Sequence, residues 1–140
     1  MKVLGLASYP VTAAATRYRL EQFVAPLAER DIDLSIHPFI DEHLFAQMYR
    51  RDALQRKALG MIKPTLLRLT DVLRGYRADV IMVQREAMMF GPPLIEWLTA
   101  RIGGRPLVLD LDDATYVSYT SPTYGRLGQA LKWFRKTDDL

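Results

Sequence analysis

Charged side chains follow three apolar runs of the sequence, at the points where each run gives way to polar residues. Thr16 to Arg19 (T-R-Y-R) come after the first run, Gln84 to Glu86 (Q-R-E) after another, and Asp110 to Ala114 (D-L-D-D-A) after the last. Guanidinium groups bind phosphate or carboxylate, and carboxylates bind hard cations or N–H groups. The candidate binding residues are therefore Arg17, Arg19, Arg85, Glu86, Asp110, Asp112 and Asp113; their catalytic roles are left open.

Arg17 and Arg19 fall in the first turn of a helix that the apolar spacing predicts over Arg17 to Arg30. The helix dipole disfavours cations there by about 0.3 to 1 kcal/mol each. Two guanidinium groups beside free helix N–H groups would suit a phosphate or carboxylate ligand. The alternative is that one or both pair with Glu21 or with a carboxylate across the cleft.

Asp110 and Asp112 lie two residues apart in a predicted strand, and therefore on one face and about 7 Å apart. At an effective dielectric constant of about 20 they repel by about 2 kcal/mol, so they need a cation, hydrogen bonds or exposure to water. Arg85 is the expected partner. The aspartates could equally organise the turn by accepting hydrogen bonds from loop N–H groups. A D-x-D pair could also bind a divalent metal. The phosphatase motif D-x-D-x-T is not matched, because Ala114 stands in place of its threonine.

Several chemistries are excluded or disfavoured. The chain has no cysteine, which removes disulfides and thiolate chemistry, and it has neither a G-x-G-x-x-G nor a P-loop motif. His37 and His43 match no zinc motif, and a structural or surface role is expected for them. No apolar run is long enough to span a membrane, so we expect a cytoplasmic protein, or one peripheral to the inner face of the membrane.

The elements that position these residues alternate between strands and helices. Strands are predicted at Val3 to Ala7, at Ile32 to Ile36 near a sheet edge, at Asp79 to Gln84 and at Pro106 to Leu111. Helices are predicted between them, over the ranges 17–30, 41–51, 52–76 with interruptions, and 94–102, and a last one over 124–136. This order predicts one α/β domain over residues 1–140, with a doubly wound, Rossmann-like parallel sheet in three layers. Its ligands would bind at the carboxyl ends of the strands.

The basic character of the chain is concentrated in one segment, Arg50 to Arg77. It holds eight lysines and arginines against two aspartates, whereas the whole chain has a net charge of only +3. Leucines alternate with these cations, which fits either a solvated helix covering the core or a basic helix lying on an anionic membrane. No nucleic-acid partner is expected, because aromatic residues are not interleaved with the basic ones.

Taken in this order, the T-R-Y-R helix, the A-D-V-I-M-V-Q-R-E strand and the P-L-V-L-D-L-D-D-A strand resemble the amino-terminal domain of a GT-B glycosyltransferase of the family 4 type. The resemblance extends over essentially all 140 residues. It implies transfer of a sugar from a nucleotide-sugar donor to a glycan or lipid-linked acceptor, with the acceptor held by this domain. Carboxylates such as Asp110, Asp112 and Asp113 would then accept hydrogen bonds from sugar hydroxyls.

The resemblance also implies a second, carboxy-terminal domain that binds most of the donor and carries an E-x7-E type motif, which this sequence lacks. We therefore expect the chain to be a fragment that is inactive alone, with no metal and no tightly bound cofactor. The loop from Val11 to Ala15 lacks the glycine of that family, which shifts phosphate binding to Arg17 and Arg19.

A different class of protein also fits the pattern. A complete small α/β protein of the flavodoxin or response-regulator type could bind Mg²⁺ with its acidic cluster. Its acidic pair should follow the first strand, where this chain has Ser8 and Tyr9. That mismatch favours the glycosyltransferase reading.

Overall fold

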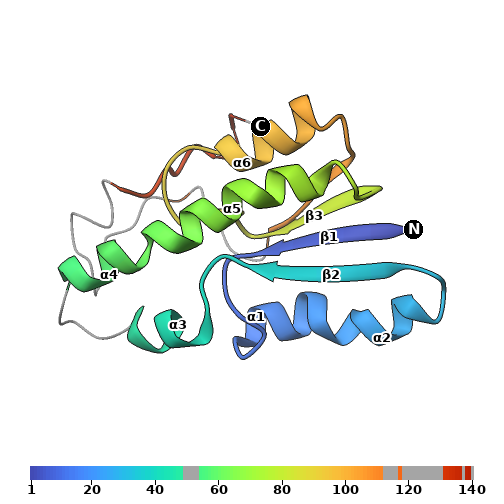
Figure 1. Cartoon of the computed structure of the whole chain (residues 1–140), viewed down its shortest axis with the longest axis horizontal. Helices are drawn as coiled ribbons and strands as arrows, with labels where there is room; N and C mark the ends of the chain where they lie inside the picture. Colours follow the sequence, from blue (N-terminus) through green and yellow to red (C-terminus); the bar gives the residue numbers. More distant parts are fainter. Residues whose placement is uncertain (49–53, 112–116, 118–130, 137, 140) are drawn as a thin grey trace.

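The computed structural model describes residues 1–48, 54–111, 117, 131–136 and 138–139 (Figure 1). In this part of the chain, four parallel strands form one sheet in the order β2-β1-β3-β4. The strands are β1 (Lys2–Ala7), β2 (Asp33–Pro38), β3 (Val80–Gln84) and β4 (Leu107–Asp110). The predicted strands are confirmed to within one or two residues at their ends, as is the edge position of the second. The fold class is α/β.

Helical segments follow each of the first three strands. They are α1 (Ala14–Thr16), the π-helical turn η1 (Arg17–Glu21) and α2 (Gln22–Ala28) after β1; α3 (Glu42–Met48), α4 (Leu54–Gly60) and α5 (Ile62–Gly75) after β2; and α6 (Leu94–Trp97) with the π-helical turn η2 (Leu98–Ile102) after β3. Figure 1 shows α1 and α2 along one side of the sheet and α5 and α6 along the other. The two central strands, β1 and β3, are therefore placed between helices.

The predicted helix over residues 124–136 lies mostly outside the described residues, and its end is not helical. The chain forms a turn over residues 134–136. Lys132 forms an isolated parallel bridge with Gly91, and the backbone N–H of Gly91 donates to the carbonyl of Leu131. Leu131 is helical, but the bridge at Lys132 and the turn that follows it show that the helix does not continue through Lys136.

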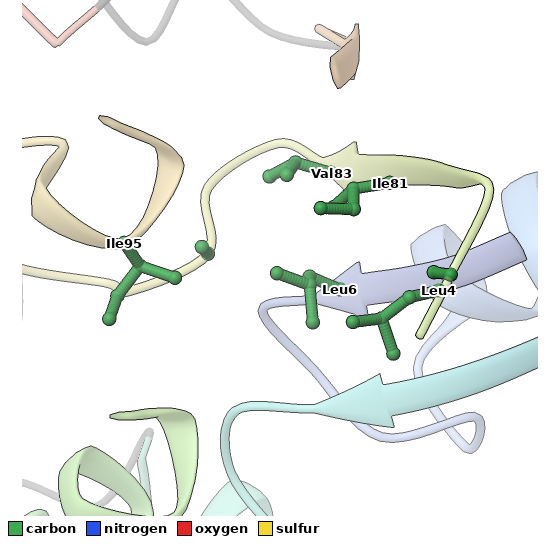
Figure 2. Close-up of a cluster of buried hydrophobic side chains, with 7 residues drawn as sticks. Leu4, Leu6, Ile81, Val83 and Ile95 are labelled. Atoms are coloured by element: carbon green, nitrogen blue, oxygen red, sulfur yellow. The ribbon is translucent and has the colours of Figure 1, made fainter. Parts of the chain in front are cut away.

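The main core lies between the sheet and the helices α5 and α6. Figure 2 shows its side chains converging from β1, β3 and α6. Alternate residues of the strands supply them, because a strand turns every second side chain to the same face. The buried members are Leu4, Leu6, Ala78, Ile81, Val83, Ala87 and Ile95. This core holds the two central strands in register, and so fixes the positions of the chain segments that follow them.

Helix α5 contacts the sheet in an unexpected way, because its most buried residues are Arg68, Asp71 and Gly75. Gly75 lies close to Ile81, since a Cβ atom at that glycine would be 3.1 Å from the Cδ1 atom of Ile81. The leucines of α5 are largely exposed instead. Helix α5 therefore covers the core, as one interpretation of the basic segment predicted, but it does so through Arg68, Asp71 and Gly75 and not through its leucines.

Candidate functional site

The carboxyl ends of β1, β3 and β4 lie side by side, because these strands are parallel neighbours. The residues that come next in the chain, or end the strand, are Ser8, Arg85 and Asp110. In open α/β sheets ligands bind at this edge. The structure therefore places two of the predicted site residues, Arg85 and Asp110, where the fold class predicts a site.

Arg19 joins this edge from the helical segment after β1. Its Nη1 atom lies 2.5 Å from Oδ1 of Asp110, an ion pair between residues 91 positions apart in the sequence. The side chains are 40% and 20% exposed, so both remain accessible to water. One alternative foreseen from the sequence, a pair with a carboxylate across the cleft, is thus confirmed for Arg19. The guanidinium and the carboxylate together offer donors and acceptors for a polar ligand.

Arg17 does not join this pair. It is exposed, its guanidinium carbon lies 5.2 Å from the centre of the Tyr18 ring, and its Nη1 atom makes a long contact of 3.5 Å with the carbonyl of Thr12. Residues two apart on a helix do not share a face, which explains why Arg17 and Arg19 diverge. The predicted pair of neighbouring guanidinium groups is therefore not formed.

The helical segment also begins earlier than predicted. Its first residue is Ala14, and the backbone N–H of Arg17 donates to the carbonyl of Ala13 at 3.0 Å. Arg17 and Arg19 thus follow the turn that holds the free N–H groups, so the prediction that they lie in the first turn, beside those groups, is wrong. They lie instead in η1, where the N–H of Gln22 donates to the carbonyl of Arg17. Such π-helical turns often occur at functional sites.

Arg85 meets Asp110 through the backbone. Its N–H donates to the carbonyl oxygen of Asp110 at 2.8 Å, while the Asp110 carboxylate pairs with Arg19. The Asp110 carboxylate thus pairs with Arg19 and not with Arg85, while the expected pairing of Arg85 with Asp112 lies outside the described residues. Arg85 has a φ of 71°, a left-handed conformation that is uncommon for a residue with a side chain. Strained residues of this kind cluster at functional sites.

Glu86 is buried, and its carboxylate faces two lysine side chains. Its Oε2 atom accepts a hydrogen bond from Nζ of Lys136 at 3.0 Å, and Nζ of Lys132 lies 3.8 Å from Oε1. Its carbonyl accepts a hydrogen bond from the hydroxyl of Ser8 at 2.9 Å. Glu86 thus binds the segment around Lys136 to the loop after β3, and the structure gives it a structural position.

Asp112 and Asp113 lie outside the described residues, so the predicted acidic cluster is described only at Asp110. Among the residues that the structure describes, no group of three or more His, Asp or Glu side chains could hold a metal ion. Asp110 is half-buried and already paired with Arg19.

A second polar cluster, at the carboxyl ends of β1 and β2, was not anticipated from the sequence. Arg68 donates to the carbonyl oxygens of Ala7 at 2.8 Å and His37 at 3.0 Å, and also to Asp71 at 3.2 Å. Asp71 receives a further hydrogen bond from Arg74 at 2.6 Å and lies 2.7 Å from Nδ1 of His37. The i, i+3 spacing of Arg68 and Asp71 was the available signal. His37, for which the sequence predicted a structural or surface role, thus takes part in this polar cluster.

Burial changes the acid–base chemistry of this cluster. Loss of hydration lowers the pKa of Arg68 to about 10, although the charge of Asp71 partly offsets that effect. The guanidinium therefore remains charged near neutral pH. It acts as a fixed donor to two strand ends and not as a proton-transfer group.

No protein-family model matches this chain, and neither a curated protein nor a solved structure does. In the part of the chain that the structure describes, no helix is long and apolar enough to cross a membrane.

The Arg19–Asp110 ion pair should contribute little to the stability of the fold. Because both side chains are partly exposed, we expect Arg19→Met to lower the free energy of unfolding by less than about 1 kcal/mol. Urea unfolding followed by circular dichroism measures this, with the exposed Arg30→Met as a matched control. A loss above about 2 kcal/mol would contradict the expectation and would make the pair a structural contact.

Proposed function

We propose that this chain is the acceptor-binding domain of a GT-B type glycosyltransferase, with a three-layer, doubly wound, Rossmann-like fold. The enzyme would transfer a sugar from a nucleotide-sugar donor to a glycan or lipid-linked acceptor. The observation that carries the proposal is the accessible Arg19–Asp110 pair beside the strained Arg85, at the carboxyl edge of an all-parallel sheet. This is the edge at which α/β sheets bind polar ligands.

The chemistry of the pair suits a sugar. An ionised carboxylate accepts hydrogen bonds from hydroxyl groups, and a guanidinium donates to hydroxyl oxygens; both are stronger than neutral hydrogen bonds. Asp110 would orient one or two hydroxyls of the acceptor while Arg19 holds the carboxylate in place. Arg17, which is exposed beside Tyr18, is free of this arrangement and could meet a donor phosphate. A second domain would bind most of the donor.

The magnesium-binding alternative is less well supported. A hard cation needs several oxygen ligands, whereas the carboxylate of Asp110, which ends β4, is already paired with Arg19 at 2.5 Å. A metal would have to displace that guanidinium. The same contact that favours a sugar therefore disfavours a cation.

Binding of simple glycosides tests the proposal on the chain itself. Methyl glycosides of glucose, galactose, mannose and N-acetylglucosamine would be titrated into the ¹⁵N-labelled protein, with the amide signals of Arg85 and Leu111 as reporters beside the pair. We expect at least one glycoside to cause saturable shifts. Asp110→Asn should weaken that binding roughly tenfold, because a hydrogen bond to a charged group contributes about 1.5 to 3 kcal/mol.

Two controls make the result decisive. Arg30→Met changes an exposed cation in the turn after α2 and should leave glycoside binding unchanged. A parallel titration with MgCl₂ tests the alternative. Saturable shifts with MgCl₂ and none with any glycoside would overturn the glycosyltransferase proposal.

A further inference from the structure

Helices α4 and α5 present a long apolar face to solvent. The backbone stays helical through Met61 between them, and the N–H of Met61 donates to the carbonyl of Lys57. Large apolar residues then recur at alternating steps of three and four, which places them on one side of the helix. We call this side the α4–α5 apolar face; its exposed residues are Leu59, Ile62, Leu66, Leu69, Leu73 and Tyr76.

The orientation of this face is fixed by the opposite side of the helix. Arg68 binds backbone carbonyls of β1 and β2, Asp71 lies against His37, and Gly75 packs against Ile81. Turning the leucines inward would break all of these contacts. Leu59 and Leu73 are accordingly 68% and 66% exposed. Contiguous exposed apolar surface of this kind marks an interaction site.

The charges on this surface have one sign. Lys63, Arg74 and Arg77 are exposed, whereas Asp71, the one acidic residue between 57 and 77, is buried and paired. Lys63 follows Leu59 by four residues, and Arg77 follows Leu73 by four. Residues four apart are neighbours on a helix, so the cations lie beside the leucines on the exposed surface.

We propose that the α4–α5 apolar face binds the surface of an anionic lipid bilayer. Leucine side chains would enter the interface, and the cations would contact anionic headgroups. The long stems of Lys63 and Arg77 allow them to reach the headgroups while the leucines beside them are buried. This inference is independent of the glycosyltransferase proposal, because it uses none of the residues of the carboxyl edge.

A second copy of the chain fits this face less well. Pairing the face with itself would bring cations of the same sign together and leave them without acidic partners. The sign of the charge therefore favours an anionic lipid surface.

Flotation of the purified chain with lipid vesicles tests this inference. We expect binding to vesicles that contain phosphatidylglycerol in phosphatidylcholine, little binding to phosphatidylcholine alone, and weaker binding as the NaCl concentration rises. Lys63→Glu combined with Arg77→Glu should weaken binding at least tenfold. Leu66→Ser combined with Leu73→Ser should do the same without affecting the fold, because both leucines are exposed.

The matched controls lie on α2 and the turn after it, on the other side of the sheet (Figure 1). Phe23→Ser removes an exposed apolar side chain there, Arg30→Glu reverses an exposed charge, and neither should change vesicle binding. Absence of binding to anionic vesicles, or binding that both α4–α5 double variants retain, would overturn the inference. So would a dimer, measured by light scattering, that the double leucine variant dissociates while the unaltered chain fails to float.

Discussion

Replacing Arg68 by methionine is expected to lower the free energy of unfolding by about 3 to 5 kcal/mol, which is a large part of the stability of a domain of this size. Arg68 is 1% exposed and donates to Asp71 and to the carbonyl oxygens of Ala7 and His37. Methionine fills a similar volume but donates nothing. The variant therefore leaves a buried carboxylate and two buried carbonyl groups with fewer partners.

Burying the charged guanidinium of Arg68 by itself disfavours the folded state. Its pKa falls to about 10 on folding, chiefly because burial removes hydration. A base whose pKa falls on folding lowers the stability of the folded protein at every pH below its pKa in the folded state. This cost declines as the pH rises above 10. The stability that Arg68→Met is expected to lose therefore comes from the acceptors left without their donor. It does not come from the burial of the charge, which is unfavourable.

Urea unfolding near pH 7 measures the effect. Arg77→Met is the matched control, because it removes an exposed guanidinium just beyond the end of the same helix and should change stability by no more than about 0.5 kcal/mol. Arg68→Lys keeps the charge but cannot reach three acceptors with the same geometry, and should be intermediate. Equal stabilities of Arg68→Met and Arg77→Met would contradict the assigned role of Arg68.

The strands could be predicted from the sequence because their signal is local. Leu4, Leu6, Ile81 and Val83 lie in short apolar runs whose alternate residues form the core. The orientation of α5 could not be predicted in this way, because hydrophobicity alone would turn its leucines inward. Arg68 faces the sheet because the ends of two strands offer it carbonyl oxygens. These acceptors, on Ala7 and His37, lie 61 and 31 residues before Arg68 in the sequence, so no local pattern reveals them.

The sequence predicted where the candidate residues lie and offered a carboxylate across the cleft as one partner for Arg19, but it did not identify Asp110 as that carboxylate or the partners of Glu86. The fold class places ligands at the carboxyl ends of the strands, and Arg19, Arg85 and Asp110 do lie there or reach there. Arg19, and not Arg17, pairs with Asp110 because of the direction in which Arg19 extends from η1, and the sequence does not determine that direction locally. The inward position of Glu86 depends on Lys136, which lies 50 residues further along the chain.

Lys136→Met is expected to lower the free energy of unfolding by about 3 kcal/mol. It removes one partner of a buried ion pair and leaves the charge of Glu86 buried with less compensation. Glu86 and Lys136 have side chains only 9% and 8% exposed, and Nζ of Lys136 also donates to the carbonyl of Met88. Lys132 remains, but at 3.8 Å it offsets only part of the loss. Lys132→Met should therefore cost less than Lys136→Met.

A double-mutant cycle with Glu86→Gln decides whether this contact fixes the position of Glu86. If Lys136 is its principal partner, the double variant should be more stable than the sum of the two single losses predicts, by about 1 to 3 kcal/mol, since the uncompensated charge is gone. Additive losses would contradict the assignment, because they would show that Glu86 and Lys136 contribute to stability independently. The measurement thus decides whether the buried contact between Glu86 and Lys136 holds the segment around Lys136 against the loop after β3.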